Sequence, residues 1–160
     1  MAKEMKTNAM RILEKNKVNY DTITYECETF IDGLHTAERT GVPVEQSFKT
    51  LVAQGRSGQY YVFVIPIAEE VGLKQAAKVV GEKSVELIPV KELTKVTGYI
   101  RGGCSPLGMK KQFPTIIDES ARHFSQVYVS GGRIGISLKL NPEELAGVIG
   151  ARFYNIKSVT

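Results

Sequence analysis

The amino-acid sequence predicts an α+β fold, with a mixed, mainly antiparallel sheet or a partly open barrel flanked by short helices. Two observations lead to this expectation. Stretches with a helical period interleave with short β-rich stretches without a linker, and the strand-like stretches form hairpins rather than a repeating βαβ order. The chain has 160 residues and no internal repeat, so we expect a single domain covering residues 1–160.

The first part of the chain is expected to contain two helical pieces and one strand. Apolar residues recur at every third or fourth position of Lys3–Asn16, which predicts an amphipathic helix. Val18–Tyr25 has the composition of a strand. His35–Thr40 is expected to be a short helical piece that is ended by Gly41 and Pro43.

The middle of the chain predicts a hairpin followed by short helices. Ser47–Ala53 is expected to pair with Tyr60–Ile67 across the turn sequence GRSG. The elements expected after the hairpin are a helix over Leu73–Val80 ended by Gly81, an extended piece over Val85–Ile88, and a helix over Val90–Thr97 ended by Gly98.

The last third predicts strands and one well-marked helix. The expected strands are Thr115–Asp118, Gln126–Ser130 and Gly135–Leu140, the last two joined through GGR, with Arg152–Ile156 closing the sheet. Asn141 is a typical N-cap, Pro142 suits the first helical position, and two acidic residues follow in the first turn. The helix that they begin is expected to end near Gly150.

Composition excludes several classes of protein. Hydrophobic residues make up 42% of the chain and charged residues 24%, as in a globular protein. The N-terminal MAKEMKTNAMRILEKNK has no apolar stretch like that of a secretory signal, and the longest apolar run, YYVFVIPIA, is too short to cross a bilayer. Two cysteines and two histidines offer neither a disulfide framework nor metal-ligand spacing. We therefore expect a cytoplasmic protein without membrane association, metal or cofactor.

Positive charge is concentrated in one part of the sequence. The net charge is only +4, yet residues 93–117 contain no acidic residue. The basic residues in this window are Lys95, Arg101, Lys110 and Lys111. Such a window is typical of a surface that binds an anionic partner such as a nucleic-acid backbone, although a solvated basic loop would look the same.

The stretch RGGCSPLGMKK, residues 101–111, is the most unusual in the chain. It lacks the Gly-Lys-Ser/Thr ending of a nucleotide P-loop and the glycine spacing of a dinucleotide fingerprint. Cys104 has no base nearby in the sequence, since His35 and His123 are far away along the chain. We therefore interpret Cys104 as a small buried residue rather than as a nucleophile.

Two further features suggest a ligand site. The segment YVSGGRIG, residues 128–135, is a second glycine-rich turn with a basic residue. Glycines allow the backbone to approach a ligand closely, although two ordinary tight turns would have the same composition. Lys49 lies within the strand-like FKTL. It either points to solvent or lies inward, where its charge would require an anionic partner.

Together these motifs resemble the YbaK/EbsC family, the free-standing Cys-tRNA(Pro) deacylases related to the editing domain of bacterial prolyl-tRNA synthetases. The resemblance spans nearly the whole chain. It rests on RILEKNKV near the start, TYE at 24–26, SFKTLV at 47–52, TGYIRGGCSPLGMKKQFPTIID at 97–118 and YVSGGRIG at 128–135. It implies the fold of the editing domain associated with prolyl-tRNA synthetase.

The resemblance also implies site residues. Lys49 would hold the phosphate of the 3′-terminal adenosine, and the loop that begins at Gly102 would line the aminoacyl pocket with its backbone. The substrate-binding residues implied are Tyr25, Thr50, Tyr99, Gly103, Ser105, Pro106 and Ser130. The residues expected to contact tRNA are Arg101, Lys110, Lys111 and Arg133. The chain departs from relatives at Cys104, Ile134 and Ser137, where they often carry an aliphatic residue, a basic residue and, in some, Asp.

The implied activity is release of cysteine from mischarged Cys-tRNA(Pro), in which the thiol of the attached cysteine attacks its own ester. The implied partner is aminoacyl-tRNA, with a complex of tRNA and prolyl-tRNA synthetase as a further partner. Two alternatives stay open at this point. The chain could act on another small amino acid, such as alanine on tRNA(Pro), or it could be a non-catalytic module that binds aminoacyl-tRNA or a synthetase.

Overall fold

The computed structural model describes residues 6–24 and 41–158. The helices are α1 (Asn8–Lys15), α3 (Leu73–Val80), α4 (Val90–Thr97) and α5 (Pro142–Ile149), with the short 3-10 helices η1 (Val44–Gln46) and η2 (Glu119–His123). The strands are β1 (Tyr20–Thr24), β2 (Phe48–Gly55), β3 (Tyr60–Pro66), β4 (Val85–Leu87), β5 (Thr115–Asp118), β6 (Val127–Ser130), β7 (Ile136–Leu140) and β8 (Arg152–Tyr154).

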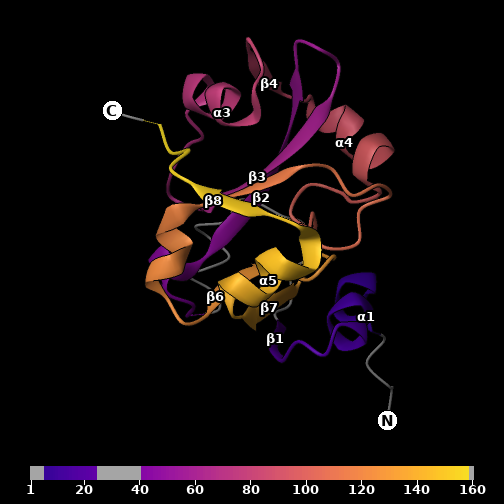
Figure 1. The fold of residues 1–160 in the computed structure, drawn as a ribbon. Helices are drawn as coiled ribbons and strands as arrows, with labels where there is room; N and C mark the ends of the chain where they lie inside the picture. Colours follow the sequence, from indigo (N-terminus) through magenta and orange to yellow (C-terminus); the bar gives the residue numbers. More distant parts are fainter. Residues whose placement is uncertain (1–5, 25–40, 159–160) are drawn as a thin grey trace.

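The strands form two sheets, which confirms the predicted α+β class with mixed and antiparallel pairing (Figure 1). The smaller sheet has the order β1-β7-β6 and is antiparallel throughout. The larger sheet has the order β4-β2-β3-β5-β8, and its β3–β5 and β5–β8 pairs are parallel. A parallel bridge between Ser47 and Tyr128 links the start of β2 to β6, so the two sheets meet there.

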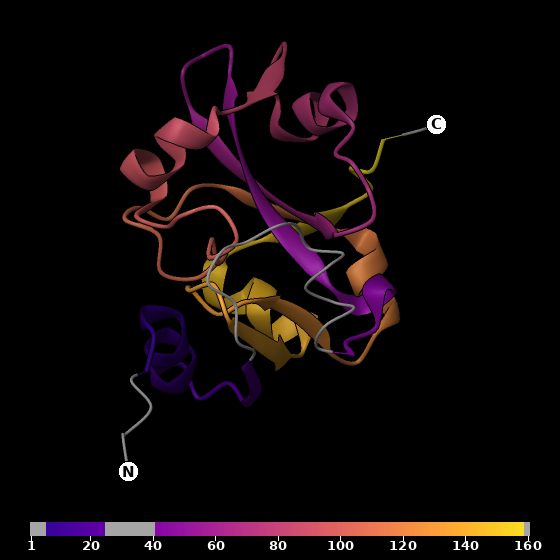
Figure 2. The same cartoon turned by 180° about the vertical axis from the view of Figure 1, so that it is seen from behind.

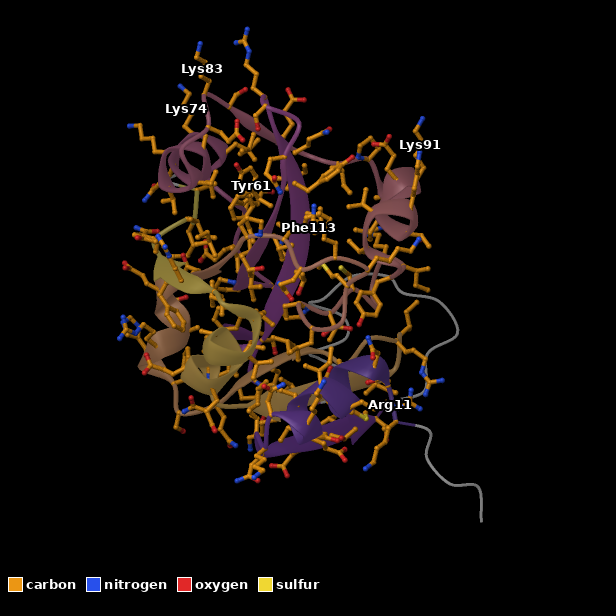
Figure 3. All side chains as sticks on the ribbon, turned by 45° about the vertical axis from the view of Figure 1, so that its right-hand side comes forward. Arg11, Tyr61, Lys74, Lys83, Lys91 and Phe113 are labelled. Carbon is orange, nitrogen blue, oxygen red and sulfur yellow. The ribbon has the colours of Figure 1, made fainter. Side chains whose placement is uncertain are left out.

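Two groups of buried side chains hold the layers together. The larger core contains side chains from both sheets, from α5 and from the inner face of α1, and it includes Leu13, Phe48, Leu138 and Leu145. The smaller core lies between α3 and the other face of the larger sheet, and it includes Phe63. In Figure 3, Lys74, Lys83 and Lys91 project outward from the molecule, whereas Tyr61 and Phe113 lie within it.

The local start and stop signals of the helices are confirmed. Gly81 and Gly98 cap α3 and α4 with left-handed φ values of 79° and 88°, a conformation that glycine adopts without a steric penalty. Asn141 accepts a hydrogen bond from the backbone N–H of Glu144 at 2.9 Å, and Pro142 follows it at the first helical position. None of the described helices is long and apolar enough to cross a membrane.

Two strands end at other residues than expected, because their backbone groups form hydrogen bonds with another segment. β2 continues past Ala53 to Gly55 because its last residues pair with β4. β8 ends at Tyr154, and the backbone N–H of Ile156 donates instead to the buried carboxylate of Asp118 at 3.1 Å. The helical piece expected at residues 35–40 lies outside the described residues.

Candidate functional site

The two glycine-rich turns that the sequence singles out touch each other. A Cβ atom at Gly103 would lie 3.1 Å from the Cα atom of Arg133 and 3.2 Å from the backbone nitrogen of Ile134. The turn that contains Gly103 therefore packs backbone against backbone on the turn between β6 and β7. Only a residue without a side chain allows this approach without displacing one of the turns.

Tyr99 fills the space between these turns. Its hydroxyl donates a hydrogen bond to the carbonyl of Leu107, and a Cβ atom at Gly108 would lie 2.7 Å from that hydroxyl. On the other side, a Cβ atom at Gly132 would lie 3.4 Å from the Tyr99 ring. Burial raises the pKa of Tyr99 to about 12, so its phenol is protonated at neutral pH and donates to the backbone. Tyr99 thus fixes the spacing of the two turns.

The interior of the first loop is buried. Ser105 is fully buried, and its hydroxyl accepts a hydrogen bond from the backbone N–H of Leu107 at 3.2 Å. The Cys104 side chain belongs to the larger core, and burial raises the pKa of its thiol to about 12. Because the thiolate is the nucleophilic form, this environment supports a wall position rather than a nucleophile at Cys104.

Helix α1 supports the same loop from a distant part of the sequence. The Asn8 amide donates to the carbonyl of Gly108 at 3.3 Å, and the Thr7 side chain lies 3.6 Å from where a Cβ atom of Gly132 would be. Sequence reasoning missed both residues. The N-cap Thr7 marks only the start of a helix, and no sequence signal connects Asn8 with a loop 100 positions away.

Lys49 and Thr50 lie on opposite faces of β2. Successive side chains of a strand alternate, and Phe48 and Val52, on the face that Thr50 shares, belong to the larger core. The Thr50 hydroxyl is buried and has no hydrogen-bond partner among the described residues. Lys49 therefore extends from the other face, where it is half-buried.

The electrostatic setting of Lys49 resembles that of an anion-binding lysine. Burial lowers the pKa of its ammonium group from the ordinary value, and the carboxylates of Glu70 and Glu69 act in the opposite direction. Within residues 6–24 and 41–158, however, no carboxylate forms an ion pair with Lys49. A half-buried cation without an ion-pair partner favours binding of an anionic group.

Ser130 extends from the same side of the structure as Lys49. The parallel bridge pairs Ser47 with Tyr128, and Lys49 and Ser130 each follow two residues later. Ser130 in turn pairs with Ser137 on β7, and both are half-buried. Val127, Val129 and Leu138 face the larger core instead, which leaves a polar outer face of β6 and β7 beside Lys49.

The basic residues expected to contact tRNA surround these loops at the surface. Arg101, Lys110, Lys111 and Arg133 are all exposed. The Lys110 ammonium donates to the carbonyl of Lys95 at 3.4 Å, which attaches the end of the loop to α4. Tyr25, also expected at the site, lies outside the described residues.

No described residues form a cluster of three or more His, Cys, Asp or Glu side chains that could hold a metal ion. A hollow of about 310 Å³ lies at the opposite end of β2, where Arg56, Glu86 and Ile88 help to line it. It contains none of the residues that the sequence singles out.

Comparison with known proteins shows one family and one close relative. A family model described as the aminoacyl-tRNA editing domain matches residues 34–148. An Enterococcus faecalis protein named "Putative Cys-tRNA(Pro)/Cys-tRNA(Cys) deacylase EbsC" is 42% identical over 154 residues, which cover 96% of this chain and 94% of that protein.

Two solved structures share the fold. One, described as "a putative trans-editing enzyme for prolyl tRNA synthetase", has a TM-score of 0.81 at 24% identity and covers 98% of this chain and 100% of its own. The other, described as "hypothetical protein APE2540", has a TM-score of 0.87 at 22% identity and covers 95% of this chain and 100% of its own. At these identities the likeness shows the fold alone.

Proposed function

Since this chain belongs to the YbaK/EbsC family of aminoacyl-tRNA editing domains, we propose that it is a deacylase that releases cysteine from mischarged Cys-tRNA(Pro). The 42% identity to the Enterococcus faecalis protein across nearly the full length of both chains carries this proposal. Aminoacyl-tRNA is the partner, and the cytoplasm is the compartment in which it occurs.

Lys49 is the anchor for the 3′-terminal phosphate. Its ammonium group is half-buried and has no ion pair with the described carboxylates, so a phosphate would replace the solvation that burial removes. Ser130 on the same side of the two strands would contact the bound ester or ribose. Thr50 has a buried hydroxyl without a partner among the described residues, on the opposite face of β2. It would form part of the pocket wall rather than contact this phosphate.

The substrate supplies its own nucleophile in this mechanism. The thiol sulfur of the attached cysteine attacks the ester carbonyl carbon and forms a C–S bond, and the C–O bond to the 3′-terminal ribose breaks. The thiol proton passes to the departing ribose oxygen. The products are a cysteine thiolactone and the free tRNA. Holding the thiol and the carbonyl in a reactive arrangement can contribute roughly 7–11 kcal/mol to such a step.

The glycine loop would provide that arrangement. Gly102 has a φ of 85° and Gly103 packs against the neighbouring turn, so the loop presents backbone rather than side chains. Backbone N–H groups that point to a developing oxyanion stabilise it without having to reorganise. The buried Ser105 and Pro106 keep the loop in one shape.

Deacylation by the purified protein, without added metal, tests this function. The substrates are Cys-tRNA(Pro), Cys-tRNA(Cys), Ala-tRNA(Pro) and Cys-tRNA(Pro) with its cysteine sulfur blocked by a methyl group. We expect rapid loss of cysteine with the blocked substrate spared. Release of alanine or of the blocked amino acid would instead indicate attack by water, and no turnover of any substrate would favour a binding module.

A further inference from the structure

We infer that α1 and α4 extend the basic loops into a continuous track that binds the phosphates of a double-stranded RNA stem, next to the site rather than inside it. This inference rests on the proposed function, because the stem would be the acceptor stem of the aminoacylated tRNA. The track adds Arg11, Lys91 and Lys95 to the loop residues named above.

The contacts that make the track continuous are those of the loop itself. At one end, Lys110 donates to the carbonyl of Lys95, and its backbone N–H donates to the carbonyl of Thr97 at 3.0 Å. Two residues earlier in the loop, Asn8 donates to the carbonyl of Gly108. The loop therefore joins the last turn of α4 to the first turn of α1.

Basic side chains continue along both helices from these contacts. Lys91 and Lys95 are four residues apart on α4 and share one side of it. On α1, Arg11 lies three residues beyond Asn8, on the face opposite to the buried Ala9 and Leu13. Figure 3 shows Lys91 and Arg11 projecting from α4 and α1 on the same side of the molecule.

Among the described residues, no ion pair involves Arg11, Lys91 or Lys95. The acidic residues of the two helices are Glu14, three residues after Arg11, and Glu92, three residues before Lys95. The Glu14 carboxylate is already engaged, since it accepts hydrogen bonds from Lys6 and Tyr20. The Lys110 ammonium lies at the carbonyl of Lys95, so the positive charge of the loop continues into the last turn of α4.

The composition of the track favours a duplex over unpaired bases. Proteins that bind single strands offer exposed aromatic rings on which bases stack. Of the large exposed apolar side chains in the described residues, Val90 lies on α4 and Ile100 between α4 and the loop, and the one aromatic among them, Tyr154, is on β8. A surface of lysine and arginine without such rings is suited to phosphates.

The test compares two variants that lose the same charge. One is Arg11→Ala/Lys91→Ala/Lys95→Ala. The other is Lys74→Ala/Lys78→Ala/Lys83→Ala, which removes three exposed lysines at α3 and before β4, away from the track (Figure 3). Each is assayed with full-length Cys-tRNA(Pro) and with a cysteinylated CCA trinucleotide that has no stem.

For the track variant we expect kcat/KM on full-length tRNA to fall by on the order of tenfold or more, through KM. The slope of log kcat/KM against log salt concentration should shrink by roughly three, since each lost phosphate contact on a duplex contributes about 0.9. The trinucleotide should be cleaved as by the wild type, and the α3 variant should behave as the wild type on both substrates. Equal losses for the two variants, or an equal loss on both substrates, would overturn the track.

Binding of uncharged tRNA, measured in parallel, separates this inference from the proposed function. Suppose that the wild type cleaves neither ester but binds tRNA, and that only the track variant binds it more weakly. This result would refute the deacylase and support the track. Unchanged tRNA binding by the track variant would refute the track whatever the activity.

Discussion

The two ends of the β2–β3 hairpin are held in contrasting ways. At its tip, the Glu82 carboxylate accepts hydrogen bonds from the Tyr61 hydroxyl at 2.7 Å and from the backbone N–H and hydroxyl of Ser57. At the other end, β2 starts beside β6, and β6 leads into the turn at Arg133, on whose backbone Gly103 packs. The tip is therefore held by the side chain of Glu82, whereas the packing at the other end requires that residue 103 has no side chain.

The difference implies that the tip contributes mainly to stability and the glycine turns mainly to the proposed function. Removing a side chain at the tip breaks hydrogen bonds and loosens the hairpin, far from the candidate site (Figure 2). Adding a side chain at the glycine turns moves backbone that would line the substrate pocket. We therefore expect changes at the tip to appear mainly in thermal unfolding, and changes at the turns mainly in the rate of deacylation.

The largest effect should come from Lys49→Met. Losing the charge-assisted contact to a phosphate costs about 2–3 kcal/mol, or roughly a hundredfold in deacylation rate. The melting temperature should be unchanged or higher, since burial disfavours the Lys49 charge. Single-turnover deacylation and thermal unfolding measure the two quantities. A lower melting temperature that accounts for the lost activity would place Lys49 in the scaffold.

Gly103→Ala should lower the deacylation rate about tenfold, because the two turns must separate by a few tenths of an ångström and the reacting atoms lose their arrangement. Gly147→Ala in α5 is the matched control. A Cβ atom there meets nothing within 4 Å, so alanine should stabilise the helix by about 0.5–1 kcal/mol and leave the rate unchanged. Equal rates for the two variants would remove the contrast between the two ends.

Glu82→Gln should lower the melting temperature and leave deacylation unchanged. Hydrogen bonds from Ser57 and Tyr61 lower the pKa of the Glu82 carboxyl from its ordinary value of 4.5. A carboxyl group whose pKa is lower in the folded than in the unfolded state stabilises the protein at any pH above its unfolded-state pKa. This stabilisation is lost as the pH falls through its folded-state pKa. The difference in melting temperature between wild type and variant should therefore be full at pH 7 and shrink below about pH 4.5. A difference that is the same at all pH values would argue against a role for the carboxylate charge.

The smallest effect is expected at Cys104. Because burial raises its pKa from 9.0 to about 12, the thiolate should be roughly a thousandfold less abundant than in an exposed cysteine. In a Cys27→Ser variant, iodoacetamide should leave the native protein unmodified at pH 8 and label it once it is denatured in urea. Mass spectrometry follows the label. Rapid labelling of the native protein would reopen the nucleophile hypothesis.

The parts of the fold that could be predicted from the sequence are those set by near neighbours. The bounds of α3, α4 and α5 follow from Gly81, Gly98 and Asn141, whose effects act within one helical turn. The hairpin was equally accessible, since the turn at residues 55–58 lies between two β-rich runs.

The site was only partly predictable, because its geometry comes from contacts between distant segments. The sequence marks both glycine turns but carries no signal that Gly103 touches the turn at Arg133. Lys49 shows a different difficulty. The polar Thr50 lies on the core face of β2, so polar and apolar residues do not alternate regularly along this strand. The direction of the Lys49 side chain could therefore not be inferred from the pattern.

The pairing of β1 with β7 has a consequence for synthesis on the ribosome. Tyr20 pairs with Leu140, so β1 must wait until the ribosome has made the chain between them, roughly 6–24 s at the usual rates of translation. An unpaired strand is a hazard for aggregation during such a delay. Asp21, Thr22 and Thr24 give β1 a polar character, which suits a strand that has to remain soluble in the nascent chain before its partner exists.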